Sequence, residues 1–249
     1  MLEVQNLAVT YRGLSALNGV SFTIYPGELV GLIGPNGAGK STMVKAMLGL
    51  LPASNGVVTF GRKPLKQQRQ QVAYVPQRSQ IDWDYPVTVW NVVMMARTMY
   101  TGWFCGSSRQ SRELVEDALQ RVEMWEMRHR QIGELSGGQQ QRVFLARAIA
   151  QQAELFLFDE PFTGIDKKTE AIIFEIFSEL KAEGKTLLVS SHQWGDALTQ
   201  YDRLLLLNQQ LIASGIPQEV MTLENIQRAY GEGVHPSNVK SPVETLYFC

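Results

Sequence analysis

The chain has few cysteines, almost no net charge and no long apolar run. Its two cysteines, Cys105 and Cys249, lie far apart in the sequence and indicate neither a disulfide framework nor a zinc site. The 23 basic and 24 acidic side chains give a net charge of -1, which provides no basic field for nucleic acid. No apolar stretch approaches the ~20 residues that span a bilayer, and the first residues do not resemble a signal peptide. We therefore expect a soluble, cytoplasmic protein without a nucleic-acid partner.

One stretch fits the phosphate-loop pattern G-x-x-x-x-G-K-[ST] at every fixed position. It consists of Gly34, Pro35, Asn36, Gly37, Ala38, Gly39, Lys40, Ser41 and Thr42. Residues 28–33 before it read as a buried strand, and residues 42–48 after it read as a helix. A glycine-rich turn at a helix N-terminus directs backbone N–H groups at one point, where the helix dipole favours an anion. We expect Lys40 to contact the β- and γ-phosphates of a nucleoside triphosphate and Ser41 to ligate Mg²⁺.

Two carboxylates end a second buried strand. Asp159 and Glu160 follow the apolar residues 155–158. At the carboxyl end of a strand beside the phosphate loop, Asp159 suits Mg²⁺, reached through a coordinated water. Glu160 could orient and deprotonate the attacking water. Their alternative interpretation is a pair of solvated acids. Tyr11 could stack on an adenine ring, or it could simply pack on a sheet.

A second glycine-rich helix start lies at Ser136, Gly137, Gly138 and Gln139. Ser136 and Gln139 form a capping-box pattern that opens a helix running to Ala150. The pattern leaves both glycines unexplained, although each costs ~1 kcal/mol relative to alanine inside a helix. Bare N–H groups in a first turn suit a closely approaching anion. Because the phosphate loop already binds a phosphate from one side, this second element is most useful when another subunit supplies it.

The order of the patterns indicates an α/β core interrupted by a helical insertion. Predicted strands cover residues 2–11, 20–24, 56–61, 72–77, 186–190 and 203–207, besides the two described above, and a helix is predicted at 167–181. Residues 88–100 and 109–127 have helical periodicity, and residues 62–69 read as a solvated loop. We assign residues 1–78 and 151–230 to the core, 79–150 to a helical subdomain and 231–249 to a loosely ordered tail.

Taken in order, these motifs resemble the nucleotide-binding subunit of an ATP-binding cassette (ABC) transporter. The resemblance implies a RecA-like P-loop core with a mainly parallel sheet, an N-terminal antiparallel β region and a helical subdomain insertion. It identifies residues 34–42 as Walker A, Leu135 to Gln139 as the signature, and residues 155–159 as Walker B. The implied catalytic residues are Glu160, His192 and Gln77, with Ser41, Gln77 and Asp159 on Mg²⁺. Tyr11 would stack on the adenine of ATP, and Asp166 would end the D-loop.

Residues 82–89 and 161–166 resemble one branch of that family, the importers for manganese, zinc or chelated iron. This resemblance implies a homodimer across two ATP sites, an integral membrane permease as partner, and indirectly a solute-binding protein. The subunit would lie peripherally on the cytoplasmic face of the inner (plasma) membrane. A cytosolic ABC ATPase of the Fe–S assembly type shares the same motifs and is the alternative. DNA-repair ABC ATPases need long coiled coils, for which the chain has no room.

The segment 81–89 is predicted to be the docking surface for the membrane subunit. It combines apolar and aromatic residues with Asp82 and Asp84, which would be costly to bury unpaired. Pro86 keeps Tyr85 out of helical geometry, so the segment should begin as an irregular surface loop. In the alternative interpretation, its aromatic residues, among them Trp83, form the core of the helical insertion.

Overall fold

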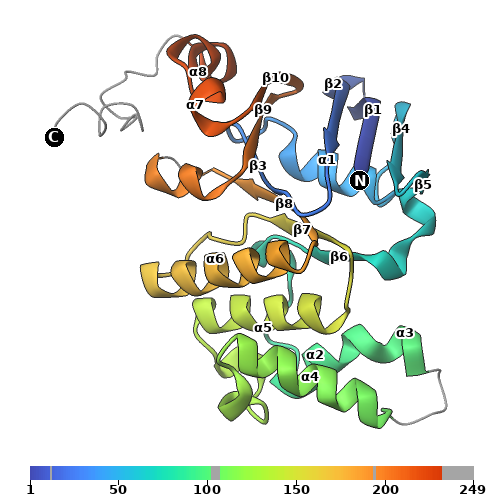
Figure 1. Cartoon of the computed structure of the whole chain (residues 1–249), viewed down its shortest axis with the longest axis vertical. Helices are drawn as coiled ribbons and strands as arrows, with labels where there is room; N and C mark the ends of the chain where they lie inside the picture. Colours follow the sequence, from blue (N-terminus) through green and yellow to red (C-terminus); the bar gives the residue numbers. More distant parts are fainter. Residues whose placement is uncertain (12, 102–106, 193–194, 232–249) are drawn as a thin grey trace, which may run out of the picture. The chain divides into compact units, whose positions relative to one another are not determined.

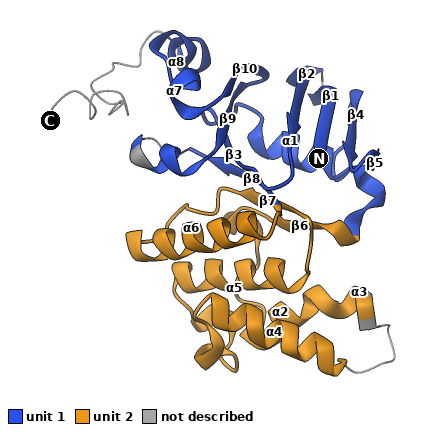
Figure 2. Ribbon diagram, in the orientation of Figure 1, with its two compact units in different colours: residues 1–69, 186–249 blue, residues 70–185 orange. Residues whose placement is uncertain are grey.

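The computed structural model describes residues 1–11, 13–101, 107–192 and 195–231. The chain forms two compact units, one made of residues 1–69 and 186–249 and the other of residues 70–185 (Figure 2). Our assignment of residues 79–150 to a separate helical subdomain stays a prediction. Of the predicted loose tail, residues 232–249 lie outside the described residues.

Unit 1 begins with an antiparallel sheet, as predicted. It contains β1 (Leu2–Tyr11), β2 (Leu14–Ile24), β4 (Asn55–Phe60) and β5 (Lys63–Pro64) in the order β2-β1-β4-β5 (Figure 1). Apolar side chains recur along β1 with an interruption at Asn6, which has φ 50° at a register shift. The residues 62–69, predicted as a solvated loop, instead contain β5 and a 3-10 turn whose Leu65 is buried.

The phosphate loop of unit 1 directly follows a buried strand that has parallel neighbours. β3 (Leu29–Ile33) pairs in parallel with β8 (Thr186–Ser191) on one side and β9 (Arg203–Asn208) on the other. All five residues of β3 are buried, as a continuous apolar strand with neighbours on both sides requires. β10 (Gln210–Gly215) pairs antiparallel with β9, and α7 (Pro217–Val220) and α8 (Leu223–Tyr230) follow. After the loop comes α1 (Lys40–Met47).

Unit 2 is mainly helical around two parallel strands. β6 (Val72–Val75) pairs with β7 (Leu155–Asp159). The helices are α2 (Val89–Met94), α3 (Thr98–Thr101), α4 (Arg109–Arg121), α5 (Gly137–Ala150) and α6 (Lys167–Ala182), with α5 lying between α4 and α6 (Figure 1). The predicted helix 88–100 is divided by a 3-10 turn at Met95–Arg97. The helix predicted over 109–127 ends at Arg121, since Glu123 adopts the left-handed φ of 56°.

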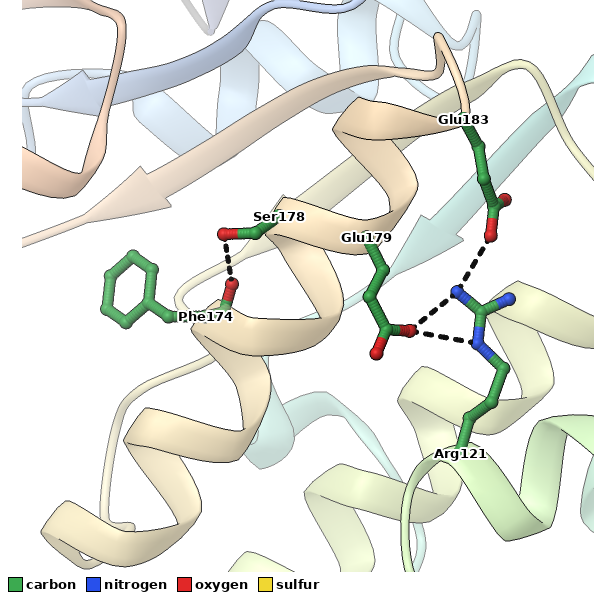
Figure 3. A network of polar contacts seen from close by, with 5 residues as sticks. All are labelled: Arg121, Phe174, Ser178, Glu179 and Glu183. Atoms are coloured by element: carbon green, nitrogen blue, oxygen red, sulfur yellow. Dashed lines mark hydrogen bonds and ion pairs between the residues drawn. The ribbon is translucent and has the colours of Figure 1, made fainter.

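A polar network ties α4 to α6 within unit 2. The guanidinium of Arg121 donates to Glu179 Oε2 at 3.0 and 3.2 Å and to Glu183 Oε1 at 3.0 Å (Figure 3). Within α6, the hydroxyl of Ser178 donates to the carbonyl of Phe174. Partly exposed ion pairs of this kind contribute about 1 kcal/mol or less each. They therefore add to the stability that the buried phenylalanines of unit 2 provide. Within the described residues, no helix combines the length and apolar character needed to cross a bilayer.

Candidate active site

Two glycines of the phosphate loop are required by close packing within unit 1. A Cβ on Gly34 would overlap the carbonyl oxygen of Leu207. Gly39 has φ 95°, and a Cβ there would lie 2.7 Å from Cδ2 of Leu17. A side chain at either position would therefore displace the backbone of the loop.

The N-terminus of α1 has no side-chain cap. Gly39 occupies the N-cap position and supplies no hydrogen bond from a side chain. By contrast, α4, α5 and α6 begin at Ser108, Ser136 and Asp166, whose side-chain oxygens each accept a backbone N–H. Phosphate oxygens are the acceptors that an uncapped helix N-terminus suits. The donor set of the loop therefore fits the triphosphate of a nucleotide.

Lys40 is held against the phosphate loop. Its side chain is buried, and Nζ donates to the carbonyl oxygens of Gly34 at 2.8 Å and Pro35 at 3.1 Å. A buried ammonium needs such acceptors, because burying it without them would be costly. The loop thus fixes a positive charge beside its own backbone, where an anion would be attracted.

The other predicted residues of unit 1 lie at strand and helix ends. Tyr11 ends β1 with 52% of its surface exposed, so its ring is accessible to a stacking partner. Ser41 and Thr42 lie in the first turn of α1 and are half-buried. His192 follows β8 directly and is exposed. These positions are compatible with the predicted roles, which remain predictions.

Within unit 2, the fold brings Glu160 and Gln77 together. Nε2 of Gln77 donates to Oε2 of Glu160 at 2.9 Å, across 83 positions of sequence. Glu160 adopts φ 52°, a left-handed conformation that non-glycine residues rarely adopt. Thr163 Oγ1 lies 3.5 Å from the same carboxylate oxygen. The Glu160 carboxylate is therefore oriented by the amide of Gln77 and by an unusual backbone conformation.

Asp159 ends β7 with 1% of its surface exposed. On β6, burial and then the charge of Asp159 raise the pKa of the Tyr74 phenol, which stays neutral at physiological pH. Among the described residues, no three His, Cys, Asp or Glu side chains cluster as a complete metal cage. Mg²⁺ bound to one or two protein oxygens and to phosphates needs no such cage. Asp159 in unit 2 and Ser41 in unit 1 each offer a hard oxygen donor of the kind that this ion prefers.

The predicted capping box at Ser136 is confirmed. Oγ of Ser136 accepts from the backbone N–H of Gln139 at 3.3 Å, and Oε1 of Gln139 accepts from that of Ser136 at 2.9 Å. A Cβ on Gly138 would lie 2.7 Å from Thr169 Oγ1, so packing on α6 explains this glycine. This contact could not be predicted from the sequence, because Thr169 is far from Gly138 along the chain.

Asp166 has a structural role that the sequence did not reveal. Its carboxylate caps α6 by accepting from the backbone N–H of Thr169 at 2.8 Å and from Thr169 Oγ1 at 3.2 Å. The backbone hydrogen bond from Thr169 is the main cause of the lowered pKa of Asp166. Thr169 thus binds Asp166 and packs closely against Gly138, the second residue of α5.

Comparisons with known proteins agree with these motifs. Residues 17–163 match the ABC transporter family. The chain is 47% identical to the manganese transport system ATP-binding protein MntB of Halalkalibacterium halodurans, over 92% of each chain. It is 46% identical to the zinc transport system ATP-binding protein TroB of Treponema pallidum, over 92% of this chain and 86% of that one. Among solved structures, a dimeric bacterial ABC transporter cassette is similar with a TM-score of 0.77 and 28% identity, covering 87% of this chain and 98% of that one.

Proposed function

This chain belongs to the ABC transporter family, and from that premise we propose that it is the ATP-hydrolysing subunit of a transition-metal importer. The observation that carries the proposal is near-full-length similarity to the ATP-binding proteins of manganese and zinc transport systems. The same similarity does not favour a cytosolic Fe–S assembly ATPase. A manganese and a zinc relative are almost equally similar to this chain, and we assign the choice of metal to other subunits of the system.

The substrate of the proposed reaction is ATP. We assign its phosphates to residues 34–42, with Lys40 as the cation on the β- and γ-phosphates, and its adenine to Tyr11. Bound Mg²⁺, held by Ser41, Gln77 and Asp159, would neutralise charge on those phosphates.

Glu160 is the proposed general base, which removes a proton from the attacking water. The hydrogen bond from Gln77 Nε2 supports this role, because it holds the carboxylate in one orientation. We assign His192 to the γ-phosphate and Asp166 to the interface between two copies. Removing any of these contacts should slow hydrolysis more than it weakens ATP binding.

We infer that two copies bind two ATP molecules between them. In this arrangement Ser136, Gly137, Gly138 and Gln139 of one copy meet the nucleotide held by the phosphate loop of the other. Similarity to a dimeric cassette supports this inference.

Ser136→Arg should prevent ATP-dependent dimerisation and leave ATP binding by the monomer intact. An arginine at this position would place a bulky side chain where the second copy approaches. Binding is measured with a fluorescent nucleotide, and dimerisation by size-exclusion chromatography. Ser108→Arg is the matched control, because Ser108 caps α4 in the same unit, and either cap contributes about 1 kcal/mol. Loss of ATP binding by monomeric Ser136→Arg would mean that the signature acts within its own chain.

Residues 81–89 remain our proposed docking surface for the membrane permease. The structure changes which residue best tests it. Trp83 is half-buried, with its ring centroid 5.2 Å from that of Phe144 on α5 in an edge-to-face arrangement, and its Nε1 donates to the carbonyl of Arg78. Tyr85 is 61% exposed, so it can contact a partner without supporting unit 2.

Tyr85→Ala should abolish co-purification with an integral membrane protein and leave the ATPase rate of the isolated subunit within about twofold. The tagged subunit is isolated from detergent-solubilised membranes of its own cells. Tyr25→Ala is the control, because Tyr25 is 54% exposed in unit 1. If the unmodified subunit co-purified with no membrane protein, the importer proposal would fail. Co-purification by Tyr85→Ala would reject only the docking surface.

A further inference from the structure

Arg78 contacts the first turn of α5, which begins within the signature residues 135–139 and is called the signature helix below. Its Nε and Nη2 donate to Oε1 of Gln140 at 3.2 and 2.8 Å. A Cβ on Gly137 would lie 3.2 Å from Cζ of Arg78, so the guanidinium packs directly against this glycine. Arg78 follows Gln77 and begins a short 3-10 turn, Arg78–Gln80.

The side chain of Gln140 is held in position for its contact with Arg78. It is buried, with 3% of its surface exposed, and its Nε2 donates to the carbonyl of Ile132 at 3.1 Å. This bond fixes the orientation of the carboxamide, so Oε1 faces the guanidinium. If the Arg78 guanidinium were removed, the buried Oε1 of Gln140 would lose the hydrogen bonds from Nε and Nη2, which is a costly loss.

The backbone of Arg78 is held as firmly as its side chain. Its carbonyl accepts from Trp83 Nε1 at 2.9 Å, and its guanidinium lies over the Trp83 ring, 5.6 Å from the centroid. Trp83 in turn contacts Phe144 of α5. Arg78 is therefore linked to α5 in two ways. Its guanidinium binds Gln140, and its backbone carbonyl binds Trp83, which packs on Phe144. A displacement of the backbone at residue 78 would be transmitted to α5 through both links.

We propose that Arg78 is a positioning residue that transmits the state of Gln77 to the signature helix. The inference rests on the proposed function, in which Gln77 helps to hold the Mg²⁺ of its own chain's ATP and the signature meets the ATP of the second copy. Gln77 donates to Glu160, and its peptide continues directly into Arg78. A change of partner at Gln77 moves Arg78, and Arg78 carries Gln140 and Gly137 with it. The state of one ATP site thereby sets the geometry of the other.

The proposal is tested by removing the guanidinium and measuring communication between the sites. Arg78→Met keeps an apolar stem of similar length and removes every donor, whereas Arg78→Lys restores the charge and one donor. Gln140→Met breaks the same contact from the other side. Arg109→Met is the matched control, because Arg109 pairs with Glu113 on the exposed face of α4. Each variant is made in the native chain and in the Glu160→Gln chain.

Monomeric Arg78→Met should bind a fluorescent ATP analogue within about twofold of the unmodified chain. In the Glu160→Gln chain it should weaken ATP-dependent dimerisation about tenfold or more, measured by analytical ultracentrifugation. The Hill coefficient of ATP hydrolysis in the native chain should fall towards one. Arg78→Lys should recover part of both losses, Arg109→Met should change neither, and Arg78→Met combined with Gln140→Met should cost no more than either alone.

Unchanged dimerisation and an unchanged Hill coefficient in Arg78→Met would overturn the proposal. So would additive losses in the double variant, or weakened ATP binding by the monomer, because Arg78 would then act elsewhere or only on its own nucleotide. If the Glu160→Gln chain itself formed no ATP-dependent dimer, the proposed function would fall and this inference with it. Equal dimerisation with and without Arg78 rejects the inference alone.

Discussion

Glu160→Gln should slow ATP hydrolysis by about 10²–10⁴-fold and leave ATP binding intact, as expected when a general base is lost. The substitution is nearly isosteric, and the new amide keeps an oxygen that can accept the hydrogen bond from Gln77 Nε2. What it removes is a group that can take a proton from water. Hydrolysis is measured by phosphate release, and binding with a fluorescent nucleotide.

The same variant should accumulate as an ATP-bound dimer. In the proposed cycle hydrolysis separates the two copies, so a chain that binds ATP without hydrolysing it stays closed. Size-exclusion chromatography with and without ATP detects this species. Glu113→Gln is the control, since Glu113 is an exposed residue of α4 that pairs with Arg109. Turnover at the unmodified rate in Glu160→Gln would remove Glu160 from the mechanism.

The local patterns of the sequence were sufficient for the strands and helix starts that flank the candidate site. A continuous apolar run predicted β3 and β7, because parallel strands buried on both faces need apolar side chains throughout. The pair Ser136 and Gln139 predicted the capping box, which depends on a spacing of three residues within one turn. Such features are set by neighbours in the sequence, and a single sequence reveals them.

Contacts between distant segments could not be predicted in the same way. The bond between Gln77 and Glu160, and the packing of Gly138 on Thr169, depend on how strands and helices meet. For Gly138 this had a consequence. The sequence left the glycine to be explained by an anion alone, whereas the structure gives it a packing role as well. Because both explanations require a small residue at that position, the glycine by itself does not distinguish them.

The end of a helix can also depend on a backbone conformation that the periodicity of apolar residues does not indicate. The helix predicted to reach Met127 stops at Arg121, because Glu123 takes a left-handed conformation that no pattern of apolar residues indicates. Trp83 shows a related limit. Its acidic neighbours suggested an exposed loop, and they are exposed, but the indole itself packs on Phe144. Alternating exposure within a loop therefore separates residues that support unit 2 from residues that can contact a partner.

Lys40→Ala should lower the affinity for ATP by about 10²-fold or more, because each charge-assisted contact of an ammonium with phosphate contributes roughly 1.5–3 kcal/mol. The structure already holds the ammonium at the loop through the carbonyls of Gly34 and Pro35, so little side-chain entropy would be lost on binding. Lys45→Ala on the same helix is the matched control, since its position is rotated well away from that of Lys40 around α1. Affinity is measured by isothermal titration, and circular dichroism verifies that each variant is folded. Unchanged affinity in a folded Lys40→Ala variant would show that this lysine does not bind the phosphates, and the assignment of residues 34–42 as the ATP site would lose its main cation.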